Sequence, residues 1–244
     1  MDLRGRTALV TGAARRVGRA IALHLAERGA HLAVHHHQSV AAAESAAAEI
    51  VTRGGRAHVV QSDLSDPNAA IRLVDDVVSA FGSLDILVNS AAVMQRTPFG
   101  SVTAAEWDAM MALNVRAPFL LAQAAAPHLA RATGGGAIVN IADLAAFETW
   151  PAYVPHGVSK AGIVYLTRAL ARLLAPAVRV NAVAPGAVLP PADWGPAQVE
   201  RLRASTPLQR IGDPIDVARA VAFLLESDYV TGETILVDGG RHIR

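Results

Sequence analysis

A glycine-bounded turn near the N-terminus has the residue types that bind phosphate groups. It reads Thr11-Gly12-Ala13-Ala14-Arg15-Arg16-Val17-Gly18. Gly12 permits a tight turn, Gly18 lets the following helix pack closely on the preceding strand, and backbone N–H groups at a helix N-terminus hold a pyrophosphate. Arg16 stands where a middle glycine is common in such turns. We therefore predict a dinucleotide site here, with an anion-free turn as the alternative.

The end of the second predicted strand indicates which dinucleotide binds. An acidic residue there usually binds the ribose 2′-hydroxyl. This segment has no acid, but has imidazoles, an amide and a hydroxyl, at His35, His36, His37, Gln38 and Ser39. Together with Arg15 and Arg16 these groups can contact a 2′-phosphate, which favours NADPH over NADH. A solvated turn and a metal site are the alternatives, although consecutive strand residues point to opposite faces.

Composition and charge exclude several classes of protein. The 244 residues include 22 Lys and Arg and 21 Asp and Glu, which gives a net charge of +1. This charge provides no basic field for nucleic acid and no polybasic membrane anchor. No stretch approaches 18 uncharged apolar residues, and the N-terminus has no signal-peptide core, so we expect no transmembrane helix. The absence of cysteine excludes disulfides and thiolate sites and fits a reducing cytoplasm.

The elements that must position these residues alternate regularly along the chain. Predicted strands are 7–10, 31–35, 57–61, 86–89, 137–141, 179–183 and 234–237, and predicted helices are 19–28, 40–53, 67–81, 104–130, 155–174 and 214–225. Continuously apolar strands are buried on both faces, which implies a parallel sheet covered by helices. Right-handed crossovers then give a doubly wound α/β sheet of seven strands, one Rossmann domain over residues 1–244. The irregular segment 184–207 is interpreted as a lid or substrate loop.

Further residues at the ends of these elements complete a recognisable set, which is Asp63-Leu64, Asn89-Ser90-Ala91, Asn114, Lys160, Pro185-Gly186 and Asp238-Gly239-Gly240. With the glycine turn, this set resembles the short-chain dehydrogenase/reductase family over essentially the whole chain. The resemblance implies NAD(P)H binding on a single-domain Rossmann fold, a small-molecule substrate and a homotetramer. Within the family the chain is most similar to pteridine and dihydromonapterin reductases, through its glycine turn, its His-x-His-x-Ser segment and Asp143.

The resemblance also implies roles for individual residues. Those implied to contact the dinucleotide are Gly12, Arg15, Arg16, Val17, Gly18, Asp63, Leu64, Asn89, Ser90, Ala91, Lys160, Pro185, Gly186 and Val188. Among them, Lys160 is implied to bond the nicotinamide ribose. Asn114 is implied to hold a water that feeds a proton relay, and an ordinary asparagine inside a helix is the alternative.

The family's Tyr-x3-Lys motif is altered in this chain. Lys160 is present, but His156 occupies the position of the tyrosine. A place in the first helical turn after Pro155 and the charge of Lys160 favour a neutral imidazole, whereas Asp143 favours imidazolium. An Asp143–His156 pair could act as a general acid. Tyr153 is the alternative proton donor, and a catalytically weak or silent NADPH-binding protein is the alternative function.

The substrate side departs from pteridine reductases as well. Met94 stands where those enzymes stack an aromatic ring on the pterin, and the candidates to replace that ring are Phe99, Phe147, Trp150 and Trp194. Further candidate substrate contacts are Arg16, Tyr153 and the C-terminal Arg244, which in related tetramers would reach a neighbouring subunit. We expect reduction of a pteridine or a similar planar C=N or C=O compound. The alternative substrate is a 3-oxoacyl thioester, against which the absence of serine at position 143 speaks.

Overall fold

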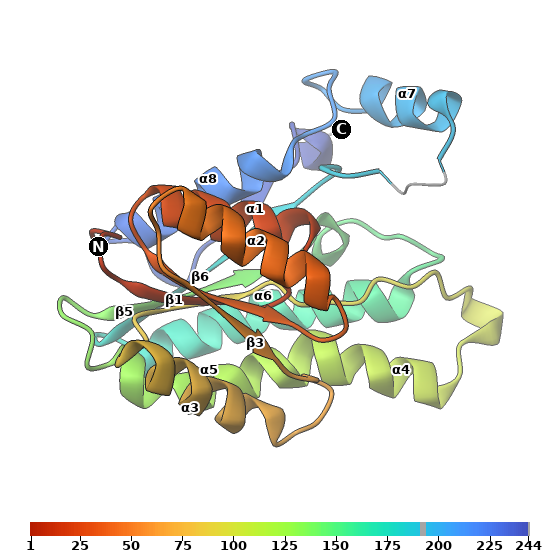
Figure 1. Ribbon diagram of the computed structural model, residues 1–244. Coiled ribbons are helices and arrows are strands. Elements are labelled where there is room, and N and C mark those ends of the chain that lie inside the picture. Colours follow the sequence, from red (N-terminus) through yellow and green to blue (C-terminus); the bar gives the residue numbers. More distant parts are fainter. Residues whose placement is uncertain (191–193, 244) are drawn as a thin grey trace.

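A parallel sheet lies at the centre of the fold (Figure 1). The computed structural model describes residues 1–190 and 194–243. Within them the strands are β1 (Thr7–Val10), β2 (His31–His36), β3 (Ala57–Gln61), β4 (Ile86–Asn89), β5 (Gly136–Ile141), β6 (Val178–Pro185) and β7 (Thr234–Val237). The order β3-β2-β1-β4-β5-β6-β7 reverses direction between β1 and β4. The predicted doubly wound Rossmann fold is confirmed, and sheets of this kind bind ligands at the carboxyl ends of the strands beside the reversal.

The strands are apolar throughout because each of their faces packs against a separate layer of helices. In β1, the side chains of Ala8 and Val10 enter one core, whereas Leu9 enters the other. In β4, Ile86 and Leu87 are divided between the two cores in the same way. Alternate side chains of a strand point to opposite faces, so a strand covered on both sides must be apolar at every position.

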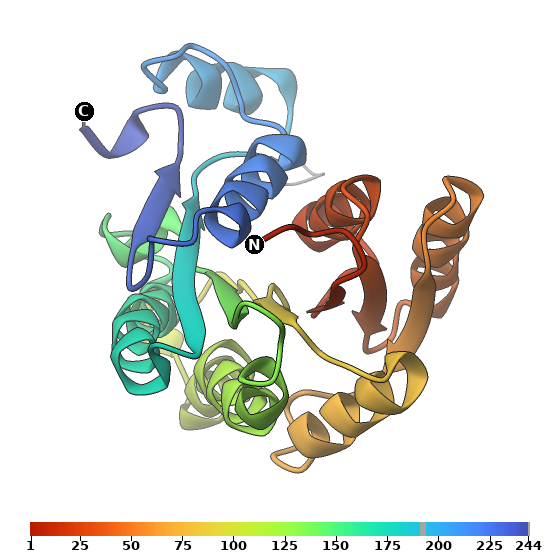
Figure 2. The same cartoon turned by 90° about the vertical axis from the view of Figure 1, so that its left-hand side faces the viewer.

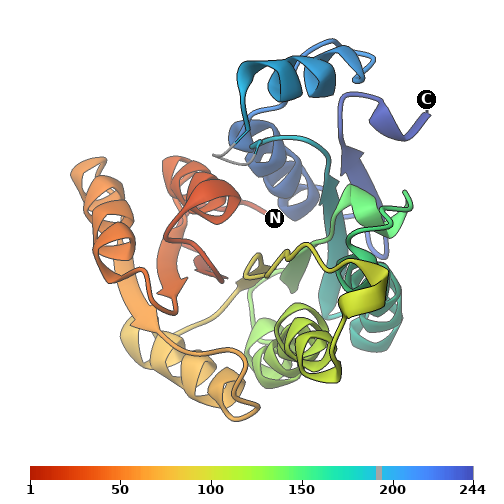
Figure 3. The same ribbon diagram turned by 90° about the vertical axis from the view of Figure 1, so that its right-hand side faces the viewer.

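The helices form two layers, one on each face of the sheet (Figures 2 and 3). Their bounds are α1 Arg16–Glu27, α2 Val40–Thr52, α3 Ala69–Phe81, α4 Ala104–Met111, α5 Ala117–Leu129, α6 Val154–Leu174, α7 Pro196–Ala204 and α8 Pro214–Glu226. Helices α1, α2 and α8 contribute to the core on one face, and α3, α5 and α6 contribute to the core on the other. This arrangement leaves the loops at the carboxyl ends of the strands free to build a site.

The long helix predicted over 104–130 contains a local irregularity. A capping box between Thr103 and Glu106 begins α4. One turn of π-helix, Ala112–Arg116, then separates α4 from α5. Such a turn inserts an extra residue into the helix and is frequent at functional sites. Asn114 lies in this turn and is buried.

Other boundaries differ from the sequence-based expectations. The segment 184–207 is not irregular throughout, because α7 occupies Pro196–Ala204 with a proline at its start. Helix α1 begins at Arg16 rather than at position 19, and α6 begins at Val154 rather than at Pro155. Strand β2 extends through His36, and β6 through Pro185. These ends depend on tertiary pairing, which local patterns indicate only within a few residues.

By length and composition alone, one helical stretch among the described residues could span a membrane. The continuous helical stretch Ala104–Leu129 is long and apolar enough to do so. In the fold, however, Leu121, Ala125 and Leu129 on this stretch are buried in the core beneath the sheet. A helix that covers a sheet and a helix that crosses a bilayer share this composition, and the packing identifies Ala117–Leu129 as a core helix.

Candidate active site

A cavity of about 860 Å³ lies at the carboxyl ends of the strands. Its lining includes residues within two positions of the ends of six strands, which are Gly12, His37, Ser62, Ser90, Ala142 and Gly186. This volume is within the range of small-molecule sites. We call the part around Gly12 and Gly18 the glycine end, and the part around Asp143, His156 and Lys160 the histidine end.

At Gly12 and Gly18, the glycine turn presents backbone to the cavity. Gly12 has a φ of +67°, and a Cβ built there would lie 3.0 Å from Ala91 Cα. A Cβ on Gly18 would lie 2.3 Å from Gly12 O, so a larger residue would displace the backbone. The Thr11 hydroxyl ties the turn to β4, because its oxygen accepts hydrogen bonds from the N–H groups of Ser90 and Ala91, at 2.9 and 3.0 Å. These contacts give the two glycines the roles that the sequence predicts.

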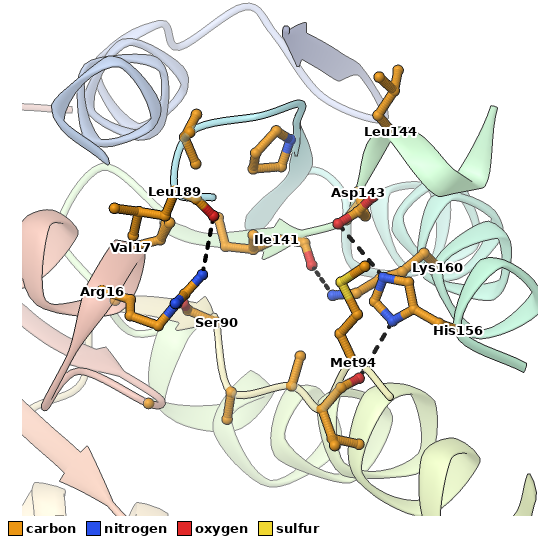
Figure 4. A pocket seen from close by; sticks show the side chains of 18 of the residues that line it. Arg16, Val17, Ser90, Met94, Ile141, Asp143, Leu144, His156, Lys160 and Leu189 are labelled. Atoms are coloured by element: carbon orange, nitrogen blue, oxygen red, sulfur yellow. Dashed lines mark hydrogen bonds and ion pairs between the residues drawn. The ribbon is translucent and has the colours of Figure 1, made fainter. Parts of the chain in front are cut away.

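Two arginines stand at the glycine end where the chain enters α1. Arg16 has a φ of +54°, a left-handed conformation that costs a residue other than glycine about 1–2 kcal/mol. Arg15 and Arg16 are exposed and line the cavity together with Val17. Arg16 Nη2 donates a 3.4 Å hydrogen bond to Leu189 O across the cavity (Figure 4). An anionic ligand at this end would therefore meet two guanidinium groups.

His35 differs from its predicted role as a phosphate contact. Its Nδ1 accepts from the Gly12 N–H at 3.1 Å, and its Nε2 lies 3.1 Å from Ser62 O, to which Nε2–H donates. Burial lowers the pKa of His35 to about 4, so the ring is neutral at physiological pH. Both ring nitrogens are therefore engaged within the protein. The side chain holds the glycine turn against the end of β3 and leaves no donor for a phosphate.

The other residues predicted to contact a 2′-phosphate point in different directions, because side chains alternate along a strand. His36 is buried and is not among the cavity-lining residues, whereas the next residue, His37, lines the cavity with a half-exposed ring. His37 Nε2 lies 3.7 Å from Asp63 Oδ2. Gln38 and Ser39 lie before α2 and do not line the cavity. In the part of the chain that the structure describes, no cluster of three or more His, Asp or Glu side chains could hold a metal ion.

Asp63 and Leu64, which the resemblance implies as dinucleotide contacts, line the glycine end of the cavity. Hydrogen bonds from the hydroxyl and the N–H of Ser65, at 2.7 and 2.9 Å, hold the pKa of Asp63 below its usual value. The Asp63 carboxylate is therefore ionised, and able to accept hydrogen bonds, at neutral pH and at pH values well below neutral. The buried Leu64 side chain packs into the core beneath the sheet.

Asn89 does not reach the cavity, in contrast to the expectation. It is buried and donates from Nδ2 to Asn140 Oδ1 at 2.9 Å. Asn140 in turn donates to Thr167 Oγ1 at 2.9 Å. This chain of polar side chains joins β4, β5 and α6 below the site, while the following residues Ser90 and Ala91 line the cavity. Asn89 therefore supports the site from behind.

The Asn114 side chain holds the segment after β4 in place through hydrogen bonds. Its Oδ1 accepts from Val93 N–H and its Nδ2 donates to Val93 O, both at 2.9 Å. The same Nδ2 lies 3.0 Å from Ser159 Oγ on α6. Asn114 is 1% exposed and does not line the cavity, so its contacts position Val93 and α6. The π-helical turn places the amide at this junction.

Lys160 and His156 lie on one face of α6, four residues apart (Figure 4). The Lys160 ammonium donates to Ile141 O at 2.8 Å. Burial lowers the pKa of Lys160 to about 8, and the nearby Asp143 carboxylate opposes this shift. The lysine thus remains mostly cationic at neutral pH beside the imidazole.

Both ring nitrogens of His156 face hydrogen-bond acceptors. Nδ1 lies 3.3 Å from Val93 O, and Nε2 lies 3.5 Å from Asp143 Oδ2 (Figure 4). The ring is 2% exposed. Asp143 is fixed by its other oxygen, which accepts from Ala145 N–H at 2.8 Å. Within the residues that the structure describes, Nε2 makes no hydrogen bond, and the Asp143 carboxylate is its ion-pair partner when the ring is protonated.

Tyr153 is the N-cap residue of α6 and lines the same end of the cavity. Its ring meets the ring of Trp150 edge to face, with centroids 6.2 Å apart. Met94 and Trp194 also line the cavity, with 50% and 37% of their surfaces exposed. Of the four aromatic residues proposed to cover a substrate, Trp150 and Trp194 therefore lie in place. Phe99 and Phe147 are exposed and are not cavity-lining residues.

Pro185, Gly186 and Val188, which the resemblance implies as dinucleotide contacts, line the wall between the two ends. A Cβ on Gly186 would lie 2.6 Å from Asp238 Cβ, which explains the glycine. Arg244, the proposed substrate contact from a neighbouring subunit, lies outside the described residues.

Leu202 and Arg241 are among the cavity-lining residues that the sequence does not indicate. Leu202 lies on α7, a helix that the analysis did not anticipate. Arg241 lies in the short helical turn Arg241–Ile243 near the C-terminus. The charge of Arg241 was visible in the sequence, but its place depends on the path of the chain after β7.

The cavity therefore combines a backbone cradle and cations at one end with an imidazole–carboxylate pair at the other. The first end suits a phosphorylated ligand. At the second end, an imidazole with its carboxylate partner can protonate an oxygen or nitrogen atom. A two-part ligand, or a cofactor and a substrate in contact, would fill both.

Comparison with known proteins identifies close relatives. Residues 12–242 match the family model described as Enoyl-(Acyl carrier protein) reductase. The chain is 40% identical to ketoacyl reductase 2 of the granaticin polyketide synthase from Streptomyces violaceoruber, over 97% of this chain and 96% of that protein. It is 36% identical to the 3-oxoacyl-[acyl-carrier-protein] reductase FabG of Staphylococcus aureus, over 98% of each.

A solved structure adds a relative of another kind. The crystal structure of FolM alternative dihydrofolate reductase 1 from Brucella canis, complexed with NADP, matches with a TM-score of 0.93 and 35% identity. The match covers all of this chain and 96% of that one. Ketoacyl reductases and a dihydrofolate reductase thus share this architecture.

Proposed function

The chain belongs to the short-chain dehydrogenase/reductase family, and we propose that it uses NADPH to reduce the carbonyl group of a 3-oxoacyl thioester or a related ketone. The observation that carries the proposal is the Asp143–His156–Lys160 group in the same cavity as the glycine turn. It offers a proton source and a cation beside the place where a carbonyl would be reduced.

The residues at the glycine end fit an NADP-type dinucleotide. A Cβ at Gly12 or Gly18 would collide with Ala91 or with Gly12 O and displace the backbone cradle that a pyrophosphate needs. Arg15, Arg16 and His37 line this end, and no acidic side chain follows β2 where it would repel a 2′-phosphate. Lys160 would hold the ribose near the nicotinamide. When bound, the nicotinamide supplies a hydride to the substrate carbon.

His156 supplies the proton in this proposal. The proton at Nε2 passes to the carbonyl oxygen as the carbon gains the hydride, so C=O becomes CH–OH and the charges balance. In this step the imidazolium ring loses one proton and becomes neutral, and its remaining Nδ1–H donates to Val93 O. Asp143, whose side chain is 23% exposed, joins the ring to solvent and is placed to restore the proton. A positioned acid of this kind contributes about 10²–10⁴-fold to a rate.

The relatives support a ketone as the substrate. The granaticin protein is named a ketoacyl reductase, and the FabG protein a 3-oxoacyl-[acyl-carrier-protein] reductase. A largely apolar wall of Met94, Trp150 and Leu202 would accept an acyl chain or a flat polyketide ring.

A pteridine is the second candidate substrate, and Asp143 favours it. This carboxylate beside His156 suits protonation of a ring nitrogen, and the Brucella relative is named an alternative dihydrofolate reductase. Trp150 or Trp194 would then cover the flat ring, in place of an aromatic residue at Met94.

Steady-state oxidation of NADPH tests the proposal. Acetoacetyl-CoA and dihydrobiopterin are supplied separately, each with NADPH and with NADH. We expect turnover with NADPH and acetoacetyl-CoA, and weaker turnover with NADH. Turnover of dihydrobiopterin alone would select the second candidate. NADPH binding without turnover of either would contradict both.

A silent NADPH-binding protein is the remaining alternative, and His156→Tyr separates it from an active reductase. If the chain lost its chemistry with the tyrosine, the substitution restores activity to an otherwise inactive protein. Under our proposal the unaltered protein is already active.

A further inference from the structure

Arg241 brings a guanidinium group to the histidine end of the cavity, from the C-terminal tail. Its side chain is 16% exposed and lines the cavity. The other arginines on the lining, Arg15 and Arg16, belong to the glycine end. The proposed reduction does not use Arg241, so its presence beside the substrate space needs another account.

The tail is held firmly enough to fix this side chain. The buried Asp238 carboxylate accepts from Gly240 N–H at 3.0 Å and from the N–H and Nδ1 of His242, at 2.7 and 2.8 Å. Gly239 and Gly240 take positive φ values of +67° and +83° to make the turn. Arg241 lies inside this closed loop, and its backbone N–H donates to Asp238 O.

A continuous wall then joins Arg241 to the reacting group. Arg241 Nε forms an ion pair with Glu148 Oε2, at 3.9 Å. The same oxygen accepts from Trp150 Nε1 at 3.0 Å. Trp150 contacts Tyr153, which caps the helix that carries His156. A substrate lying along Trp150 with its carbonyl at His156 would extend its far end toward the guanidinium.

We propose that Arg241 is a specificity-determining residue that binds a carboxylate or phosphate group at the end of the substrate remote from the reacting carbonyl. This inference rests on the proposed function for the position of that carbonyl. A partly buried guanidinium forms paired, charge-assisted hydrogen bonds with such groups, and these bonds are stronger than those it forms with neutral acceptors.

Matched aryl ketones test the inference, because they differ only at the remote end. The compounds are 4-acetylbenzoate, its methyl ester and 4-acetylphenyl phosphate, each reduced with NADPH. We expect kcat/KM at least tenfold higher for one or both anions than for the ester, and the arm that gains more identifies carboxylate or phosphate. Because the pair is electrostatic, 1 M NaCl should reduce this preference in the unaltered protein.

Substitutions then separate binding from a structural role. Arg241→Gln should raise KM for the preferred anion at least tenfold, with kcat and the kinetics of the ester little changed, and Arg241→Lys should restore part of the preference. Arg201→Gln, on the exposed face of α7, removes the same charge away from the cavity and should change neither. Equal loss for the anions and the ester in Arg241→Gln would indicate only a structural role and overturn the inference.

Binding of the same compounds to the protein with NADP⁺, followed by calorimetry, distinguishes this inference from the proposed function. If no compound is turned over but the anions bind more tightly than the ester through Arg241, the inference stands and the proposed function fails. If the unaltered protein shows no preference for an anion in either assay, the inference fails, whether or not Arg241→Gln folds.

Discussion

At the glycine end of the cavity, the groups that shape the site are backbone atoms whose hydrogen bonds are satisfied. Gly12 N–H is bound by His35, and the Thr11 hydroxyl holds the N–H groups of Ser90 and Ala91. At the histidine end, side chains shape the site, and they are held less completely. His156 Nε2 has only a 3.5 Å contact with Asp143, and Lys160 is buried with its pKa lowered.

The difference shows that the two ends respond to different demands. A dinucleotide is bound in one geometry throughout the reaction, and a backbone cradle that the fold holds in place provides that geometry. A proton donor must exchange its proton, and so its hydrogen bonds tighten only when the reacting atom is present. Substitutions at the glycine end should therefore weaken stability or NADPH binding, whereas substitutions at the histidine end should lower kcat.

The largest effect is expected from His156→Ala. Loss of the proton donor should lower kcat by about 100-fold or more, because a positioned acid contributes about 10²–10⁴-fold. NADPH affinity should remain close to that of the unaltered protein. Single-turnover kinetics and fluorescence titration measure the two quantities separately.

Tyr153→Phe is the matched control, since it removes the hydroxyl of the alternative proton donor at this end. We expect its kcat to stay within a few-fold of the unaltered protein. A severe loss of kcat in Tyr153→Phe, with a mild loss in His156→Ala, would show that the tyrosine and not the histidine is the proton donor.

The next effect concerns acid stability at the glycine end. The pKa of His35 falls from 6.5 to about 4 on folding, so between these values the unfolded chain binds more protons than the folded chain. The free energy of unfolding therefore decreases as pH falls from 6.5 toward 4, by roughly 3 kcal/mol from this residue. Urea unfolding across this range measures the decrease.

His35→Gln should flatten this dependence, because glutamine does not titrate. His37→Gln, which alters the next exposed imidazole, should keep the slope of the unaltered protein. Identical slopes in all three proteins would show that His35 does not anchor the glycine turn in its neutral form.

A smaller effect is expected from Gly18→Ala. The added Cβ would lie 2.3 Å from Gly12 O, and overpacking of this kind costs about 1–3 kcal/mol of unfolding free energy. The displaced cradle should weaken NADPH binding at least tenfold. Gly162→Ala is the control, since its Cβ would meet only Val115 at 3.6 Å or more. Unchanged NADPH binding in Gly18→Ala would contradict the cradle.

The smallest effect on stability is expected from Arg16→Gly. Glycine adopts a φ of +54° without strain, so the unfolding free energy should stay level or rise by up to about 1 kcal/mol. NADPH affinity should nevertheless fall, because one cation is lost from the glycine end. Arg16→Lys keeps charge and strain, and should change both quantities less. Thermal unfolding and calorimetry give the two values, and a gain of NADPH affinity in Arg16→Gly would remove Arg16 from the cofactor site.

The sequence predicts the sheet, the two helical layers and the glycine turn because these features follow from local patterns. Apolar runs between turn residues mark strands such as β1, and the spacing of Gly12 and Gly18 marks the turn. Alternation along β2 also predicts that His35, His36 and His37 cannot all face one ligand. Which of them does so depends on the cross-chain bonds of His35 to Gly12 and Ser62.

Other parts of the site depend on contacts between distant segments. The π-helical turn directs the Asn114 side chain toward Val93, which is 21 positions away in the sequence. No local pattern indicates the hydrogen bonds between them. Helix α7 follows a proline-rich stretch that reads as a loop, and it brings Leu202 to the cavity. Arg241 reaches the cavity only because Asp238 folds the tail back.

Chemical rescue of His156→Ala tests most directly whether this imidazole delivers the proton. Single-turnover reduction of the substrate is measured with NADPH in excess and imidazole increased stepwise. The account predicts a slow reaction without imidazole, a saturable recovery with it, and no effect of imidazole on the unaltered protein. A His156→Ala protein that reduces substrate at the unaltered rate with no imidazole present would contradict it.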